Sequence, residues 1–503
     1  MTDRELELAL ERPDRPREEC GVVGISGHSE AAHHAYLALY ALQHRGKESA
    51  GIATRNGSEM HVHKAMGLVP DIFDDETLRG LPGRHAVGHV RYSTSGASVL
   101  RDAQPILAHS GGVDLALAHN GNLTNARAIR SELEGLGSIF QSSMDSEVFV
   151  HLFARTRGSL VERLSDTFSR VRGAYSLVMM VDDVLIAARD PHGFRPLSLG
   201  RLDSAWVVAS ETCAFDLIGA TFERDVEPGE IIVIRRGRLR SLQPLPKVPE
   251  RLCIFEHIYF ARPDSQVYGA TVYQTRKQLG RELARESPVE ADMVVPVLDS
   301  GAIAALGYAE EAGLPYEPAL IRNHFVGRTF IEPEQSIRHF GVRIKHNAIR
   351  EVIENKRIVL VEDSIVRGTT LTKLVPHFRA AGPREIHVRV AAPPTTHPCY
   401  YGIDMPTREE LIASSRDVAE IARTLGADSL AYLSLDAMRR VGATMKHGFC
   451  DACFSGDYVI PVEEIQAVEK QIPLFGRSSA RGRAAATAHA ATTERRARGR
   501  PSS

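Results

Sequence analysis

Two acidic residues follow a pattern typical of a buried strand near residue 360. Ile358 to Val361 is a continuous β-branched and aliphatic stretch, as expected for a strand covered on both faces of a parallel sheet. Glu362 and Asp363 come directly after it, so they belong to the carboxyl end of the strand, where open α/β sheets bind ligands. Two carboxylates at such an edge suit vicinal hydroxyl groups or Mg²⁺.

The loop from Ser364 to Thr370 has the composition of an anion-binding turn. Its backbone N–H groups and the helix that follows would face a phosphate, and Arg367 adds a cation. It is not a P-loop, because neither GxxxxGKS nor GxxxxGKT occurs in the sequence. A strand that ends in acids before a glycine turn is also common in α/β proteins. The residues alone therefore leave a sugar-phosphate site and a structural turn open.

A second chemical centre is indicated by Cys20, which stands between a charged leader and an apolar strand pattern, CGVVGISG. Cleavage after Glu19 would give the thiol a neighbouring free α-amine. The pKa of such an amine, about 7.7 to 8.0, lies close to that of a thiol, about 8.5. Nucleophile and base would then come from one residue. The alternative is an ordinary buried thiol.

The elements that must position these groups form two domains, as the length of 503 residues suggests. A proline-rich linker, Gln243 to Glu250, separates them. Before the linker, strands joined by hairpin-like connections, with helices outside them, predict an α+β domain that ends near Val248. The expected strands are 85–90, 114–118, 175–181, 184–188, 205–210 and 230–235, and the expected helices are 31–44, 145–155 and 160–171.

Beyond the linker the order becomes strand, loop, helix, which predicts an α/β domain with a mostly parallel sheet. The expected strands include 292–297, 358–361 and 385–391, with a helix at 302–312. The segment Asn323 to Asn347 is polar and arginine-rich, and we expect it to be a functional lid.

Composition excludes several classes of protein. The net charge is −2 with 43% hydrophobic residues, and no apolar run reaches the roughly 18 residues of a membrane span. No signal peptide is recognisable, so we expect a cytosolic protein without a membrane or nucleic-acid partner. The leader and the arginine-rich tail are expected to be disordered. An RNA-binding tail is the less favoured alternative.

Several sequence blocks together resemble one enzyme family. EDSIVRGTT is similar to the phosphoribosyl-diphosphate (PRPP) motif of type I phosphoribosyltransferases. EECGVVGISG, LQHRGKESAGIAT, VGHVRYSTSG, AHNGNLTN and MDSE have the order and spacing of the glutaminase domain of the amidophosphoribosyltransferase family, so the resemblance covers about residues 18–460. It implies a propeptide that is removed (1–19), an αββα N-terminal-nucleophile (Ntn hydrolase) glutaminase domain (20–250), a type I phosphoribosyltransferase domain (251–470) and a basic tail (471–503).

The resemblance also implies roles for residues of the glutaminase domain. Cys20 would attack the side-chain amide of glutamine. Arg91 would bind the α-carboxylate and Asp145 the α-ammonium group, and Asn120 with Gly121 would form the oxyanion hole. Taken singly, Arg91 suits a structural ion pair, and Asn120-Gly121 suits a hairpin turn. Lys47 and Met144, which lie within these motif blocks, depart from the family's usual residues.

In the second domain, the resemblance assigns a PRPP site and a Mg²⁺ site. Glu362 stands where an Asp is usual in the family, and His324 and Phe325 replace its usual Arg and Tyr. The PRPP-binding residues would be Glu362, Asp363, Ser364, Arg367, Gly368, Thr369 and Thr370, and the Mg²⁺ ligands Ser300, Glu362 and Asp363.

The cysteines suggest a metal centre. Cys450 and Cys453 form CxxC, which alone fits zinc, redox or iron-sulfur chemistry. With Cys253 and Cys399 as partners, the resemblance favours a 4Fe-4S cluster of structural role, as in the subfamily with a propeptide. Cys213 is then an ordinary buried thiol.

The function expected from this resemblance is glutamine-dependent synthesis of 5-phosphoribosylamine from PRPP, with internal transfer of ammonia. Glutamine and PRPP would be the substrates, purine nucleotides the inhibitors, and the protein a homo-oligomer, a dimer or a tetramer. Two alternatives are another glutamine amidotransferase, with glucosamine 6-phosphate or asparagine as product, and a catalytically silent iron-sulfur homologue.

Overall fold

The structure is a computed structural model that describes residues 20–92, 99–322, 346–405, 407–445 and 447–461. The expected leader, the basic tail and most of the expected lid, including His324 and Phe325, lie outside the described residues. The described residues up to Val459 form one compact unit, whose fold follows.

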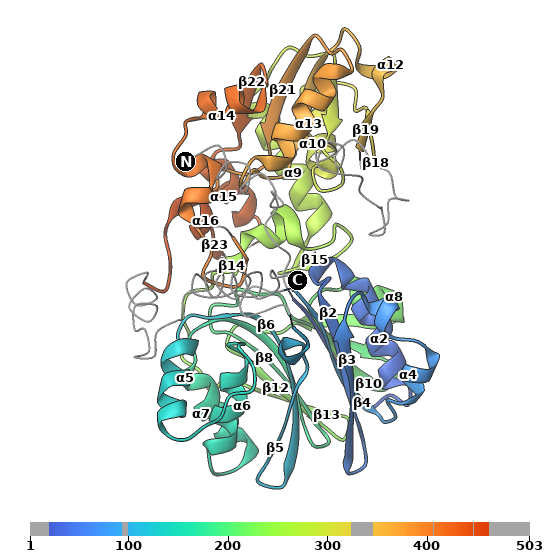
Figure 1. The fold of residues 1–503 in the computed structure, drawn as a ribbon, viewed down its shortest axis with the longest axis vertical. Helices are drawn as coiled ribbons and strands as arrows, with labels where there is room; N and C mark the ends of the chain where they lie inside the picture. The colour runs from blue at the N-terminus through green and yellow to red at the C-terminus, as the bar shows by residue number, and fades with distance from the viewer. Residues whose placement is uncertain (1–19, 93–98, 323–345, 406, 446, 462–503) are drawn as a thin grey trace, which may run out of the picture. The chain divides into compact units, whose positions relative to one another are not determined.

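The first half of the chain contains two antiparallel sheets (Figure 1). Along the first sheet the strands are β11 (Thr221–Asp225), β9 (Ser198–Leu202), β10 (Ala205–Ala209), β1 (Gly21–Ser26), β4 (His85–Arg91), β2 (Ser49–Asn56) and β3 (Glu59–Met66). Along the second they are β13 (Arg238–Leu242), β12 (Ile231–Arg235), β8 (Val184–Arg189), β7 (Gly173–Val181), β6 (Val113–Leu123) and β5 (Ile106–Ser110).

Three apolar layers hold these sheets together. Residues such as Val22, Val87, Ala118 and Val178 are buried between the two sheets. Helices cover both outer faces (Figure 1): α2 (Ala31–Ala41), α3 (Val69–Ile72), α4 (Asp75–Arg79) and α8 (Cys213–Ile218) on the first sheet, and α5 (Ala126–Gly135), α6 (Glu147–Arg155) and α7 (Leu160–Arg170) on the second. The expected αββα order is therefore present.

The second half is organised on a parallel sheet of four strands, β17 (Met293–Pro296), β20 (Arg357–Glu362), β21 (Glu385–Val390) and β22 (Ser429–Tyr432). Val359 and Val361 pack into the core on one face, and Ile358 and Leu360 pack into the core on the other. Since both faces are covered, the strand is apolar without alternation. The first face carries α9 (Val272–Glu286), α10 (Ala302–Ala312) and α15 (Leu435–Ala443), and the second α13 (Thr369–Ala380) and α14 (Val418–Leu425).

Short elements complete the second half. They are the two-strand pairs β14 (Leu252–Cys253) with β23 (Phe449–Cys450), β15 (Gln266–Val267) with β16 (Ala270–Thr271), and β18 (Leu320–Arg322) with β19 (His346–Ala348), a π-helix at Glu256–Phe260, and the short helices α12 (Arg350–Ile353) and α16 (Ala452–Ser455). The pairing of β18 with β19 places Arg322, just before the expected lid, beside His346.

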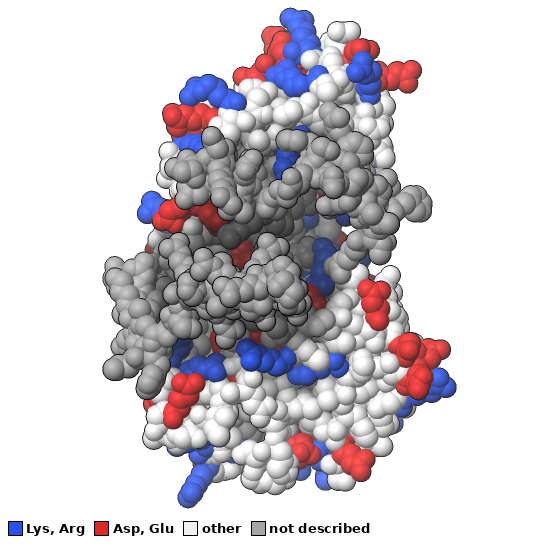
Figure 2. All heavy atoms as spheres, viewed as in Figure 1, with Lys and Arg blue, Asp and Glu red and all other residues white. Residues whose placement is uncertain are grey.

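The surface has no dominant charge in the view of Figure 2, where acidic and basic side chains are interspersed over the described residues. This agrees with the formal net charge of −2. Within the described ranges, none of the helices has the length and apolar character required to cross a bilayer.

Candidate functional site

Cys20 comes immediately before β1 and lies beside the end of β4. Gly21 pairs with Val90 in the antiparallel register, which places Cys20 level with Arg91. The thiol donates a hydrogen bond to the carbonyl oxygen of Tyr92 at 3.4 Å. The strand pair thus brings the expected nucleophile next to the expected partner of the substrate carboxylate.

Arg91 is a buried cation at the last position of β4, with only 2% of its surface exposed. Its Nη1 lies 3.6 Å from the carboxylate of Glu48. A guanidinium group offers paired donors in one plane, a geometry that matches a carboxylate. The position suits recognition of an amino-acid carboxylate beside the thiol.

Asn120 and Gly121 lie on β6. Asn120 is buried, and its amide nitrogen Nδ2 has no hydrogen-bond partner among the described residues. An unpaired buried donor costs about 1–3 kcal/mol, so such a group indicates a place where an acceptor binds. Gly121 has φ of +145°, and a Cβ atom there would lie 2.1 Å from the carbonyl oxygen of Ala174. Only glycine fits this position.

Asp145, just before α6, is held against the same strand. Its Oδ2 accepts a hydrogen bond from the backbone N–H of Leu123 at 2.8 Å, and its Oδ1 lies 4.0 Å from Nδ1 of His119. The hydroxyl of Ser146 lies 2.8 Å from the same ring nitrogen. Asp145 is therefore fixed beside the Asn120-Gly121 pair.

Two buried histidines join this group to β4. Nε2 of His89 donates to the carbonyl oxygen of His119 at 3.1 Å, so the bond crosses from one sheet to the other. Burial lowers the pKa of His89 to about 3, and burial also lowers the pKa of His119 despite the nearby charge of Asp145. Both rings are neutral near pH 7 and act here as structural links between Arg91 and Asn120.

At the second centre, Glu362 ends β20, and Asp363 follows it at the carboxyl edge of the parallel sheet. Both are buried, at 3% and 4% exposed. The hydroxyl of Ser364 donates to Asp363 Oδ1 at 2.6 Å. Gly368, with φ of +78°, turns the chain into α13, so the backbone from Ser364 to Thr370 forms the expected loop between acids and helix.

The loop after β17 passes directly against these acids. A Cβ atom on Gly301 would lie 3.3 Å from Cα of Glu362 and 2.5 Å from the carbonyl oxygen of Val361. The neighbouring Ser300 hydroxyl is buried without a hydrogen-bond partner in the described ranges. Two carboxylates and an unpaired hydroxyl are oxygen ligands of the kind that Mg²⁺ prefers, so these residues fit the ion.

Four cysteines line one cavity in the second half of the chain. Cys253 and Cys450 are paired across the parallel β14–β23 ladder, Cys453 lies in α16, and Cys399 lies in the loop after β21. Burial raises the pKa of Cys450 to about 12, and burial together with the neighbouring thiols raises the pKa of Cys453 well above its ordinary value.

Thiolates are ligands that zinc and iron-sulfur clusters share. The four cysteines line one small cavity, so the fold brings together thiols that are distant in the chain. Within the described ranges, no three His, Cys, Asp or Glu side chains are already placed as a metal-binding group. The arrangement therefore leaves zinc and a cluster open.

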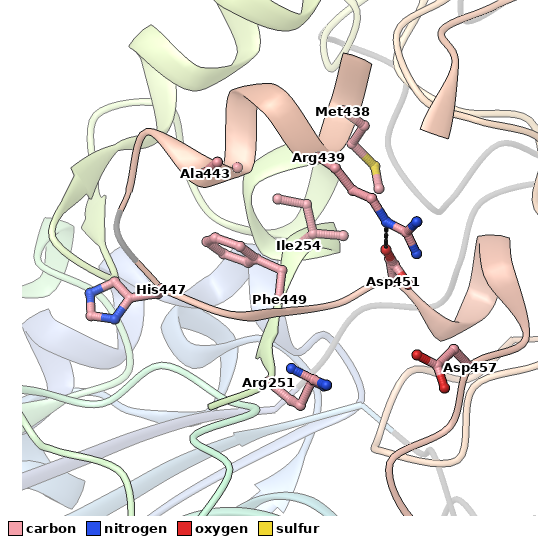
Figure 3. A pocket seen from close by; sticks show the side chains of 10 residues that line it. Arg251, Ile254, Met438, Arg439, Ala443, His447, Phe449, Asp451 and Asp457 are labelled. Carbon is pink, nitrogen blue, oxygen red and sulfur yellow. Dashed lines mark hydrogen bonds and ion pairs between the residues drawn. The ribbon is translucent and has the colours of Figure 1, made fainter. Parts of the chain in front are cut away.

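A second hollow, of about 270 Å³, lies beside the β14–β23 pair (Figure 3). Arg439 crosses it and donates from Nε to Asp451 Oδ2 at 2.7 Å. Asp451 stands between Cys450 and Cys453 and also accepts from the Ser455 hydroxyl at 2.7 Å. Asp451 therefore positions the CxxC turn, a role that the sequence alone did not reveal.

Arg45 is a further residue to which the sequence interpretation gave no role. Its Nε donates to the carbonyl oxygen of Cys20 at 3.3 Å, and its terminal nitrogens lie 2.7 and 3.0 Å from the carboxylate of Glu256. Burial would raise the pKa of Glu211, but His44 and Arg45 outweigh it and hold that pKa well below its ordinary value. Arg45 thus ties Cys20 to the start of the second half of the chain.

Comparisons with known proteins give a match in each half of the chain. The family described as "Glutamine amidotransferase domain" matches residues 89–216, and "Phosphoribosyl transferase domain" matches residues 272–404. Amidophosphoribosyltransferase 1 (chloroplastic) of Arabidopsis thaliana is 50% identical over 459 residues, which cover 91% of this chain and 81% of the relative. The chain belongs to the amidophosphoribosyltransferase family.

Other members of the family extend the comparison. The Bacillus subtilis amidophosphoribosyltransferase is 48% identical over 88% of this chain and 94% of the relative. A solved glutamine PRPP amidotransferase from B. subtilis, in complex with ADP and GMP, superposes with a TM-score of 0.83 and covers 88% of this chain and 97% of its own. The chain is therefore an enzyme that makes 5-phosphoribosylamine, glutamate and pyrophosphate from PRPP, glutamine and water, the first step of de novo purine biosynthesis.

Proposed function

We propose that amidophosphoribosyltransferase activity in this chain is divided between two centres: Cys20 releases ammonia from glutamine, and Asp363 lies where that ammonia reacts with PRPP. The observation that carries this assignment is the unpaired amide donor of the buried Asn120 on β6, the strand that His89 joins to the β4 end where Cys20 and Arg91 lie level. A donor held ready for an oxygen that gains negative charge is what amide hydrolysis requires.

At the first centre the Cys20 sulfur attacks the amide carbon of glutamine, and the thiol proton passes to the leaving nitrogen. Arg91 binds the substrate carboxylate, Asp145 its ammonium group, and Asn120 Nδ2 with the Gly121 N–H the oxyanion. Ammonia leaves, and water then releases glutamate from the thioester. Removal of residues 1–19 would supply the α-amine of Cys20 as the base.

At the second centre the loop Ser364–Thr370, including Arg367, Gly368 and Thr369, holds the phosphate of PRPP. Ser300, Glu362 and Asp363 would hold Mg²⁺, which when bound neutralises the pyrophosphate leaving group. Ammonia must stay neutral until it meets the ribose carbon, so transfer inside the protein avoids its protonation by water. We also propose that the glutaminase domain ends near residue 250 and that the phosphoribosyltransferase domain ends near residue 470.

The four cysteines, Cys253, Cys399, Cys450 and Cys453, would hold a 4Fe-4S cluster that fixes distant parts of the chain in one place. Intact mass and the visible spectrum of anaerobically purified protein test this together with the leader. A chain that begins at Cys20 and absorbs as an iron-sulfur protein supports both proposals. A colourless protein without iron contradicts the cluster, and an intact leader contradicts processing.

Regulation is proposed from relatives. The B. subtilis structure contains ADP and GMP, so we expect purine nucleotides to inhibit this enzyme as well. A homo-oligomer and a cytosolic location stay predictions from the sequence.

The division of labour is tested by Cys20→Ala. Glutamine-dependent synthesis should fall by about 10³-fold or more, while synthesis from added ammonium salt stays within about twofold. Cys213→Ala is the matched control, because Cys213 is a buried thiol of the same domain in α8. Equal loss of both activities in Cys20→Ala would contradict the two-centre assignment.

A further inference from the structure

A buried arginine of the second half, Arg276, contacts the π-helix at the start of that half. Arg276 lies on α9, which packs on the π-helix Glu256–Phe260, and only 4% of its surface is exposed. The proposed mechanism gives it no task. A buried cation is costly unless other groups stabilise its charge.

Backbone carbonyl groups take up most of its donors. Nε donates to His257 O at 2.9 Å, and Nη2 donates to Tyr259 O at 2.7 Å and to Ala261 O at 2.8 Å. All three acceptors belong to the π-helix or to the residue that follows it. Since π-helical turns are rare and occur often at functional sites, a cation that fixes one needs an explanation.

The same π-helix begins at Glu256, the buried carboxylate that pairs with Arg45. Arg45 in turn donates to the carbonyl oxygen of Cys20. A short series of hydrogen bonds therefore runs from the glutaminase nucleophile to the segment that Arg276 holds.

The π-helix that Arg276 holds also packs toward the PRPP centre. Ile258 and Phe260 belong to the same apolar core as Val361, the residue before Glu362 and Asp363. Burial lowers the pKa of Arg276, and the charge of Asp363 is the one that opposes this effect most. The segment that Arg276 holds is therefore packed against the strand that ends in the acids of the second centre.

We propose that Arg276 is a positioning residue that shapes the segment Glu256–Ala261, so that ammonia released at Cys20 is used at the Asp363 centre and not lost. The proposal rests on the two-centre function above. A guanidinium group is required because one planar group reaches three carbonyl oxygens; a lysine is a single point charge on a flexible stem.

The test is Arg276→Lys in the full-length enzyme, with glutamate and pyrophosphate measured in the same reaction. Glutamate released per pyrophosphate formed should rise about fivefold, while ammonium-dependent synthesis stays within about twofold of the wild type. Arg389→Lys is the matched control. Arg389 is about as buried on β21, and its hydrogen bonds go to Ser287 O, Val388 O and the Ser429 hydroxyl. Its variant should keep the wild-type ratio.

An unchanged glutamate-to-pyrophosphate ratio in Arg276→Lys overturns the proposal, as does an equal loss of both activities. If this variant fails to fold, hydrogen exchange of the wild type decides. Addition of Mg²⁺ and PRPP without glutamine should change the protection of amides 256–261, and an unchanged segment overturns the proposal. Failure of the two-centre function itself would appear separately, in wild-type protein that lacks either half-reaction.

Discussion

The two centres differ in the backbone that carries their polar groups. At the glutaminase centre, Arg91 and Asn120 lie within antiparallel strands that have neighbours on both sides. At the PRPP centre, Asp363 and Ser300 lie in loops at the carboxyl edge of a parallel sheet. Strands fix side chains before a substrate arrives, whereas loops present consecutive backbone N–H groups to a phosphate.

Each centre combines groups of both signs. At the first, Arg91 and the unpaired Asn120 amide would face a carboxylate and an oxyanion, while Asp145 would face an ammonium group. At the second, Glu362 and Asp363 would face a cation and sugar hydroxyl groups, while the loop after them would face a phosphate. Ammonia is the one reactant that the two centres share, and it carries no charge that either set of groups could pair with.

The largest effect should come from the acids of the loop-built centre. Asp363→Asn removes a carboxylate from the proposed Mg²⁺ site, so glutamine-dependent and ammonium-dependent synthesis should both fall about 10³-fold. Glutamine hydrolysis should persist. Asp292→Asn is the control, since Asp292 binds Arg357 at the opposite edge of the same sheet. Loss of ammonium-dependent synthesis in both variants would contradict a special role for Asp363.

The strand-built centre should respond differently. Asn120→Ala removes the oxyanion donor, and glutamine-dependent synthesis should fall about 10²-fold while ammonium-dependent synthesis is unchanged. Steady-state assays with the two nitrogen sources measure this. Asn125→Ala, which changes a loop amide bonded to Arg170 and Arg172, should leave both rates near the wild type. Full glutamine-dependent activity in Asn120→Ala would exclude the oxyanion role.

Gly121 of the first centre has a strained backbone conformation that ordinary glycine positions lack. Gly121→Ala places a methyl group against Ala174 O at a φ of +145°, so the free energy of unfolding should fall by about 2 kcal/mol or more. Gly135→Ala, at the end of α5 with open space around it, should raise it by about 0.5–1 kcal/mol. Denaturant unfolding measures both. A Gly121→Ala protein as stable as the wild type would show that the close approach to Ala174 is not required.

The segment between the centres should give a pH-dependent signal of smaller size. Burial lowers the pKa of His257 to about 4, while in the unfolded chain it titrates near about 6.5. As the pH falls from about 6.5 to about 4, the unfolded chain gains a proton that the folded chain does not. His257 therefore lowers the free energy of unfolding by up to about 3 kcal/mol over this range. Above about pH 6.5, His257 no longer makes the free energy of unfolding depend on pH.

His257→Gln should flatten the stability profile between about pH 4 and pH 6.5, as measured by urea unfolding at several pH values. His33→Gln, at an exposed histidine of α2, should keep the wild-type slope. An unchanged slope in His257→Gln would show that the ring is not held neutral.

Much of the fold followed from apolar patterning. The strand at 358–361 was predicted because Val359, Leu360 and their neighbours form a continuous apolar run, and the helix at 302–312 was predicted from the order of strand, loop and helix. The structure confirms both, as β20 (Arg357–Glu362) and α10 (Ala302–Ala312). Strand β3 was not predicted. It lies at a sheet edge, and Met60, His61 and Lys64 are only partly buried, so its pattern is too polar to indicate a strand.

The sequence indicated some residues of the candidate sites and missed others. Cys20, Arg91, Asn120 and Asp145 came from motif blocks, and the fold brings them together through β1, β4 and β6, although their roles stay proposals. Arg276 and Asp451 carry no motif, because their importance lies in partners that are distant in the chain or in backbone carbonyl groups. Such contacts exist only after folding, and one sequence cannot show them.

The β14–β23 ladder has a consequence for biosynthesis. Cys253 opens the second half of the chain, and Cys450 lies near the end of its described part, so the ladder closes a very long loop. Closing such a loop is slow, and domains fold from the N-terminus as they leave the ribosome. We therefore expect the glutaminase half to be folded before Cys450 and Cys453 have been synthesised and can approach Cys253. The cluster proposed for these cysteines would then be assembled only at the last stage of synthesis.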